Sequence, residues 1–95
     1  MTQGQRLKKI RKMLELSQDT LGAKLNVSKQ YISNLEADRN LLNNEKLVSL
    51  LIDFNVNLNY LLGGIGEPFN PAQFEDVKDE ILKEVEEMLK RRGIT

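Results

Sequence analysis

The stretch "SQDTLGAKLNVSKQYISNLEADRN", which runs from Ser17 to Asn40, decides the fold of this chain. Ser17 and Ser28 each precede a short amphipathic run, and serine is a favoured helix N-cap because its hydroxyl accepts a hydrogen bond from an unpaired backbone N–H. The first run ends at Asn26, just before the second cap. A chain that ends one short helix and begins another at once predicts two helices that cross at a steep angle.

The apolar residues of this stretch follow the spacing of a helix-turn-helix motif that begins at Gln18. Gly22 is expected where the two helices approach most closely, because only a small side chain fits there. Asn26 is expected in the turn with positive φ, a conformation that asparagine tolerates best after glycine. An unrelated helical hairpin is the alternative. The apolar positions that the motif buries are Leu21, Leu25, Val27, Ile32 and Leu35.

Helical periodicity continues on both sides of the motif, and no segment alternates with a period of two, so the predicted fold class is all-α. A first helix is expected over residues 3–14. Asn43 or Asn44 is expected to cap a fourth helix and Asn57 a fifth, with Gly63 supplying the left-handed residue that ends it. The stripes expected to be buried are Leu7, Ile10 and Leu14, then Leu47, Leu50, Leu51 and Phe54, then Leu58, Leu61 and Leu62.

The fifth helix is followed by the turn-rich stretch "GGIGEP". Beyond it, Asn70 and Pro71 have the pattern of a cap and a first helical residue, which predicts a terminal helix to about residue 92. The expected organisation is a domain over residues 1–64, a linker over residues 65–70 and a C-terminal amphipathic helix over residues 71–95.

The composition excludes several classes of function. The chain of 95 residues has no cysteine and no histidine, so it lacks thiolate metal ligands and the commonest acid–base residue. Asp19, Glu36 and Asp38 have no histidine, cysteine or glycine-rich phosphate loop beside them, and "GGIGEP" fits neither the phosphate-loop nor the dinucleotide pattern. We therefore expect no catalysis, no cofactor and no metal. No apolar run approaches the roughly 20 residues that span a bilayer, so a cytoplasmic protein without membrane association is expected.

The net charge of zero hides an asymmetry along the chain. Residues 1–46 hold nine basic against five acidic side chains, whereas residues 47–70 hold none against two and residues 71–95 five against seven. A basic front half suits a polyanionic partner, although an ordinary solvated surface explains the same balance.

Over residues 7–64, the chain resembles the phage repressor/Cro-like, or xenobiotic-response-element, helix-turn-helix proteins. The matching stretches are "LKKIRKMLELSQDTLGAKLNVSKQYISNLE" and "NLNYLLGG". The resemblance implies a five-helix lambda-repressor-like domain whose third helix enters the major groove of double-stranded DNA. The chain departs from the family at Asn26, where the turn glycine is commonest, and at "NLLNN", where a proline often precedes the fourth helix. The second departure leaves the geometry of that loop open.

The outward edge of the third helix is polar if Ile32 and Leu35 face inward. The N-terminal outward side chains of a recognition helix face the base edges. Glutamine and asparagine pair in two places with adenine, and lysine donates to guanine. A merely solvated polar face is the alternative. The expected base-reading residues are Ser28, Lys29, Gln30, Ser33 and Asn34, of which Lys29, Gln30 and Asn34 are favoured.

A second group of polar residues is expected to contact DNA phosphates. Gln18 begins the second helix, where a side-chain amide beside free N–H groups suits an anion, and the resemblance implies the same role for it. Arg39 adds a charge that gains from counterion release. Tyr31 either sends its hydroxyl to a phosphate or packs against the second helix. The expected phosphate-contacting residues are Gln18, Tyr31, Arg39, Asn40, Asn43 and Asn44.

The resemblance also implies a salt bridge between Arg11 in the first helix and Glu36 at the end of the third. Its expected role is structural, because it would hold the angle of the recognition helix. A partly buried, bidentate pair would be worth several kcal/mol when one partner is lost, and an exposed pair less than about 1 kcal/mol.

The terminal helix carries an apolar stripe with nearly heptad spacing on an otherwise charged surface. Such a stripe must be covered, either by the same helix of a second chain or by its own domain. We favour pairing, since the linker allows the helix to leave the domain. The expected dimerisation residues are Phe74, Val77, Ile81, Leu82, Val85, Met88 and Leu89.

These features together predict a sequence-specific DNA-binding transcriptional regulator. The favoured form is a homodimeric repressor that reads a palindromic operator through its third helix. The alternative is a protein-interaction adaptor, such as an antitoxin or an accessory subunit, whose C-terminal helix binds a different protein.

Overall fold

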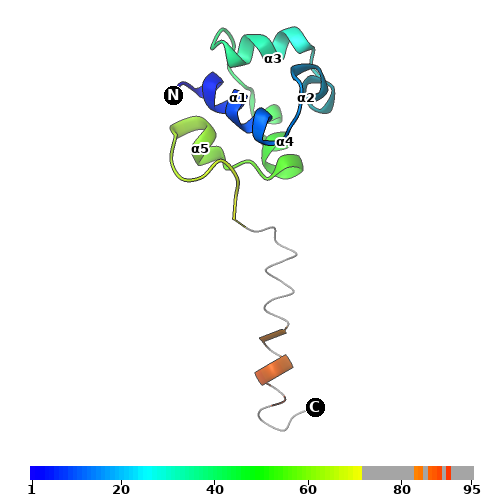
Figure 1. Ribbon diagram of the computed structural model, residues 1–95, viewed down its shortest axis with the longest axis vertical. Coiled ribbons are helices and arrows are strands. Elements are labelled where there is room, and N and C mark those ends of the chain that lie inside the picture. The colour runs from blue at the N-terminus through cyan, green and yellow to red at the C-terminus, as the bar shows by residue number, and fades with distance from the viewer. Residues whose placement is uncertain (72–82, 85, 89, 91–95) are drawn as a thin grey trace.

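The computed structural model describes residues 1–71, 83–84, 86–88 and 90. Within this part no strand occurs, and residues 56 and 69 form an isolated antiparallel bridge. The all-α prediction is therefore confirmed. None of the described helices is long and apolar enough to cross a membrane. The helices before residue 64 are α1 (Gln3–Met13), α2 (Gln18–Leu25), α3 (Lys29–Glu36), α4 (Asn44–Phe54) and α5 (Leu58–Gly63) (Figure 1).

The helices begin at the polar caps that the sequence predicts. Ser17 and Ser28 each accept a hydrogen bond from the backbone N–H three residues further on, at 3.0 Å. Asn43, and not Asn44, caps α4 in the same way, and Asn57 caps α5. Because each cap satisfies an N–H that the helix leaves unpaired, these side chains fix where the helices start.

The helix ends depend on left-handed residues. Asn26 ends α2 with φ of 59°, as the helix-turn-helix pattern predicts. The prediction for Gly63 is wrong, because Gly63 is the last residue of α5 and Gly64 takes the left-handed conformation, with φ of 70°. The cap lies one residue later because the N–H of Gly64 reaches the carbonyl of Tyr60 at 2.8 Å.

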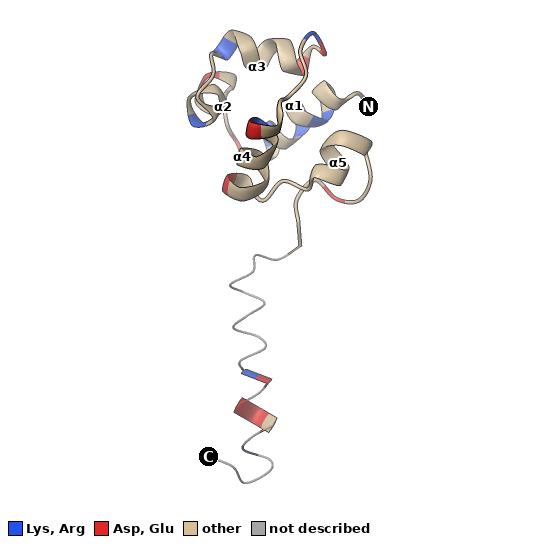
Figure 2. Cartoon of the chain, turned by 180° about the vertical axis from the view of Figure 1, so that it is seen from behind, with Lys and Arg blue, Asp and Glu red and all other residues tan. Residues whose placement is uncertain are grey.

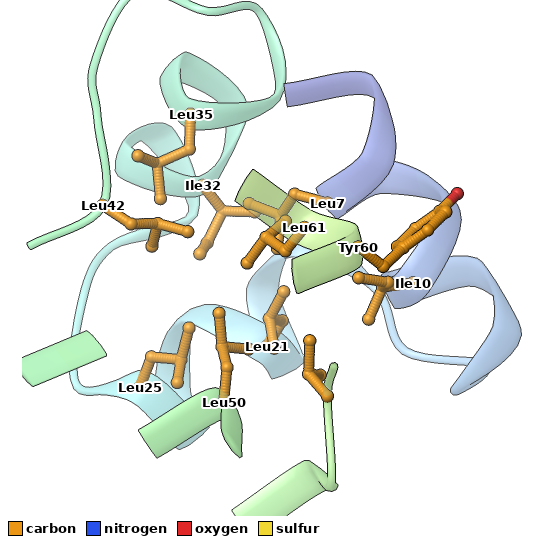
Figure 3. Packing of buried hydrophobic residues seen from close by; sticks show 11 residues of the cluster. Leu7, Ile10, Leu21, Leu25, Ile32, Leu35, Leu42, Leu50, Tyr60 and Leu61 are labelled. Atoms are coloured by element: carbon orange, nitrogen blue, oxygen red, sulfur yellow. The ribbon is translucent and has the colours of Figure 1, made fainter. Parts of the chain in front are cut away.

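One hydrophobic core lies between the five helices (Figure 3). Two predicted members are wrong, since Leu51 is 39% and Leu62 48% exposed. Each follows a fully buried leucine and therefore lies about 100° further round its helix, on the solvent side. Leu42 and Val56, which lie in loops, and Tyr60, which lies in α5, complete the core. Its buried members are Leu7, Ile10, Leu21, Leu25, Ile32, Leu35, Leu42, Leu50, Val56, Tyr60 and Leu61.

Two glycines allow other helices to approach both ends of α3. A Cβ on Gly22 would lie 2.8 Å from the carbonyl oxygen of Val27, just before the α3 cap, so the predicted close approach is present. A Cβ on Gly4, in α1, would lie 2.5 Å from the carbonyl oxygens of Leu35 and Glu36 at the other end. The helix is thus held by α2 at its start and by α1 at its end, with backbone contacts that leave no room for a side chain.

Candidate nucleic-acid interface

Helix α3 lies along one edge of the helical unit, on the side away from the segment that follows α5 (Figure 1). Ile32 and Leu35 face the core and are 0% and 3% exposed. The first turn on the opposite side is open to solvent at Ser28, Lys29 and Gln30. Because Ile32 and Leu35 face the core, the polar residues on the opposite side of α3 are accessible to a ligand. The next turn continues that edge with Ser33 and Asn34, which are half-buried.

Two of the predicted base readers contact each other. The Gln30 Nε2 atom donates to Asn34 Oδ1 at 3.1 Å, one helical turn along α3. This bond restricts both side chains to the same outward face and leaves Gln30 Oε1 and the Asn34 amide group for a base edge. A glutamine or asparagine amide pairs with adenine through one acceptor and one donor, so Gln30 can read adenine with its oxygen and its second amide N–H while Asn34 holds the first.

A buried polar network joins α1, α2 and the end of α3. Arg11 Nε and Nη2 donate to the two carboxylate oxygens of Glu36, at 2.7 and 3.0 Å, and these side chains are only 11% and 5% exposed. Arg11 Nη1 also donates to the carbonyl of Leu16 at 2.9 Å. The ion pair expected between the two helices is thus present, and it is bidentate and shielded from water. Fork-shaped geometry of this kind restrains the relative angle of two helices.

Gln18 belongs to the same network. Its Nε2 atom donates to Glu36 Oε1 at 3.2 Å. One amide N–H therefore points inward, while the second N–H and the amide oxygen remain for other partners. Since Gln18 is the first residue of α2, Glu36 orients an amide at a helix N-terminus, which is where anions bind.

The remaining candidates for phosphate contact differ in their exposure and in which of their side-chain atoms already have a partner. Arg39 and Asn40 are exposed in the loop after α3, and Asn44 is exposed at the start of α4. Asn43 uses its side-chain oxygen as the α4 cap, at 2.9 Å from the Lys46 N–H, so its amide group is what remains for a phosphate. Tyr31 is half-buried and packs against the core.

Basic residues flank this edge. Figure 2 shows lysine and arginine at both ends of α3 and along α1. Lys8, Lys9 and Lys12 on α1 are all exposed. Lys9 Nζ lies 5.7 Å from the centre of the Tyr60 ring, a cation–π distance. Such exposed charges raise the positive potential of this unit without fixing a contact.

The structural roles of Asp38 and Arg6 were missed by the sequence reasoning. Asp38, after α3, accepts a hydrogen bond from the Gly4 N–H at 2.8 Å and so caps α1 from another element. The Thr2 hydroxyl, this N–H and the charge of Arg6 hold the pKa of Asp38 below its ordinary value. Arg6 in turn donates from Nε to the Leu61 carbonyl at 2.8 Å and ties α1 to the end of α5. No local pattern marks these contacts, although a glycine inside a first helical turn is a signal of close approach.

Most of the predicted dimerisation stripe cannot be compared with the structure. Met88 is described, and it is helical and 49% exposed. The other positions lie outside the described residues, namely Phe74, Val77, Ile81, Leu82, Val85 and Leu89.

Known proteins with the same arrangement of helices were found by sequence and by structure. The sequence model of the helix-turn-helix family matches residues 7–61. A crystal structure of the P22 c2 repressor protein, in complex with the synthetic operator 9T in the presence of Tl+, is similar with a TM-score of 0.62. It is 33% identical, and the alignment covers 67% of this chain and 97% of that one.

A second solved structure, the SinR protein/SinI protein complex, shares the fold with a TM-score of 0.57 at 24% identity, over 95% of this chain and 93% of that one. No curated protein matches the chain significantly by sequence. The family match over more than half of the chain, the repressor neighbour and the exposed α3 edge lead to one conclusion. The chain belongs to the Cro/C1-type helix-turn-helix family of DNA-binding transcriptional regulators.

Proposed function

We propose that the protein is a homodimeric repressor that inserts α3 into the major groove of a palindromic operator. The exposed polar edge that begins at Ser28 carries this proposal. It is supported by the similarity to the P22 c2 repressor, a protein solved with an operator. We further propose that this regulator acts in the cytoplasm.

Within α3, Lys29, Gln30 and Asn34 are the proposed base readers. Lys29 is exposed and suits guanine, whereas the hydrogen-bonded pair of Gln30 and Asn34 suits adenine. Ser28 and Ser33 lie beside them, and a serine hydroxyl can hydrogen-bond to either of these bases. A lost bidentate base contact is worth about 1–3 kcal/mol, or roughly 5- to 150-fold in affinity for the correct sequence.

The phosphate contacts are proposed to lie on either side of this edge. Gln18 would donate its second amide N–H to one phosphate, since Glu36 holds the first. Arg39 would bind another and is the only cation among the proposed phosphate contacts. Asn40, Asn43 and Asn44 would add neutral contacts near it, and the Tyr31 hydroxyl is a further donor. The Arg11–Glu36 pair is proposed to act as scaffold, because both side chains are too buried to reach a duplex.

The base-reading assignment is tested by binding to sites selected from random DNA. Gln30→Ala and Lys29→Ala should weaken binding to the selected site and leave binding to random DNA unchanged. Arg39→Ala should weaken both alike and flatten the salt dependence by about one unit. Lys24→Ala is a matched control, because Lys24 is exposed on α2 away from the proposed contacts. Equal losses on both DNAs for Gln30→Ala would contradict base reading.

The dimer is proposed to form through residues 71–95, with residues 1–64 as the DNA-binding domain and residues 65–70 as the connection. One small domain makes few base contacts, and two domains on a palindrome multiply selectivity. The half-sites should then lie about one helical turn apart, roughly 10 base pairs, or a multiple of that.

Light scattering on the full chain tests this dimer. Ile81→Ser, on the apolar stripe, should halve the mass, whereas Lys83→Ser, two positions further on and exposed, should not. A monomeric wild-type chain would favour the adaptor alternative, in which the stripe meets a different protein. The similar chain in the SinR protein/SinI protein structure belongs to a complex of two proteins, and a monomer here would direct the search toward a protein partner.

A further inference from the structure

The chain after α5 turns back and pairs with the segment between α4 and α5. Gly64 and Gly66, with φ of 70° and 81°, allow the reversal. Residues 67–70 then lie antiparallel to residues 55–57, with an isolated bridge between residues 56 and 69. The backbone hydrogen bonds run from the Asn57 N–H to the Pro68 carbonyl at 2.9 Å and from the Asn70 N–H to the Asn55 carbonyl at 3.0 Å.

Asparagine side chains reinforce both ends of this pairing. Asn55 Nδ2 donates to the Asn70 carbonyl at 2.9 Å. Asn57 Nδ2 donates to the Glu67 carbonyl at 2.9 Å. Asn70 adds a longer bond, from Nδ2 to the Val56 carbonyl at 3.4 Å. We call the paired residues 55–57 and 67–70 the asparagine clasp.

The asparagine clasp is anchored to the hydrophobic core. Val56 is 0% exposed and Phe69 packs against the core cluster. Pro68 is buried as well. Because apolar burial and hydrogen bonds act on the same short segment, residues 67–70 belong to the helical unit and do not behave as a free linker. The segment that ends at residue 71 therefore lies at the end of the unit opposite α3 (Figure 1).

We infer that the asparagine clasp fixes the point from which residues 72–95 depart, and that Asn55, Asn57 and Asn70 thereby determine the half-site spacing that a dimer accepts. This inference rests on the proposed homodimer. A free linker of six residues, the length of residues 65–70, has an end-to-end distance of about 13 Å. One base pair shifts a half-site by about 3.4 Å and rotates it by about 35°. A free linker would absorb such a shift, whereas a clasped connection would not.

Two substitutions remove side-chain hydrogen bonds of the clasp while they keep the helix caps. Asn55 is the left-handed C-cap of α4, with φ of 58°, so Asn55→Gly preserves this helix end and removes the side-chain bond from Nδ2 to the Asn70 carbonyl. Asn57→Asp retains the oxygen that accepts from the Asn59 N–H and replaces the donor to Glu67 with a second oxygen. A matched control is Asn26→Gly with Asn59→Asp, which makes the same two changes outside the clasp.

The test uses full-length protein and palindromes that carry the selected half-site at five successive spacings. Wild type and the control should prefer one spacing by about tenfold over its neighbours. The Asn55→Gly/Asn57→Asp variant should bind all five within about threefold, with unchanged mass and half-site preference. Amide exchange at Asn57 and Asn70 reports whether the clasp is open.

A second variant keeps the test independent of clasp opening. Four glycines inserted between Asn70 and Pro71 lengthen the connection beyond the clasp and should relax the spacing in the same way. Spacing preference that survives both variants would overturn the inference. A wild-type dimer without any spacing preference would overturn it too, and would leave the proposed homodimer intact. A wild-type monomer would instead remove the proposed homodimer itself.

Discussion

Removal of the Arg11 side chain is expected to destabilise the fold severely. Glu36 would keep only the side-chain hydrogen bond from Gln18, and its side chain is only 5% exposed in the folded protein. A buried carboxylate that loses its partner costs about 3–5 kcal/mol. The loss is a large share of the roughly 5–15 kcal/mol that holds a domain folded. For a domain of this size, 3 kcal/mol corresponds to a fall in Tm of about 12–24 °C.

Urea denaturation at pH 7 and fixed protein concentration measures this loss for Arg11→Ala. Replacing both partners, as Arg11→Met with Glu36→Leu, should recover most of the stability, because no unpaired charge is left buried. Glu45→Ala is the control, since Glu45 is 80% exposed and 3.7 Å from Lys46, and it should cost less than about 1 kcal/mol. A similarly small loss for Arg11→Ala would refute the reasoning. Recovery of the lost stability of Arg11→Ala in 1 M salt would also refute it, because salt screens exposed charges much more than buried ones.

Three further outcomes follow from the contacts around α1. Gly4→Ala should destabilise the protein by about 1–3 kcal/mol in urea denaturation, because the added Cβ meets backbone oxygens of α3; an unchanged midpoint would mean that the helices do not cross so closely. Arg6→Met should cost about 1.5–3 kcal/mol in the same assay through its lost bonds to the end of α5, and Arg6→Lys should restore only part of it. The pKa of Asp38 is lowered in the folded state, so its contribution is present above the ordinary aspartate pKa of about 3.9 and is lost as the pH falls through the lower folded value. Thermal melts between pH 2 and pH 5 should therefore show a weaker pH dependence for Asp38→Asn than for wild type, and identical profiles would contradict this role.

The parts of the fold that local chemistry decides could be predicted from the sequence. Ser17 and Ser28 cap helices because their hydroxyls lie next to free N–H groups, and Asn26 accepts the left-handed turn. These contacts join residues only a few positions apart, so a short stretch of sequence contains both partners. The same holds for the polar edge of α3, which follows from the inward positions of Ile32 and Leu35.

The contacts that position this edge in space join distant residues, and for that reason most were not foreseen. Asp38 caps α1 across 34 residues, and Arg6 reaches a carbonyl 55 residues away. Neither partner is distinctive alone, since an exposed aspartate and an N-terminal arginine are common. The asparagine clasp was missed because "GGIGEP" has the composition of a free linker, whereas its pairing depends on Asn55 and Asn57 in an earlier segment.

The central claim is that the polar edge of α3 reads bases, and the affinity ratio between the selected site and random DNA tests it most directly. For Gln30→Ala the ratio should fall by roughly 5- to 150-fold while affinity for random DNA stays constant. A ratio equal to that of wild type, at the same salt concentration, would contradict the claim, because the edge would then add nothing to sequence recognition.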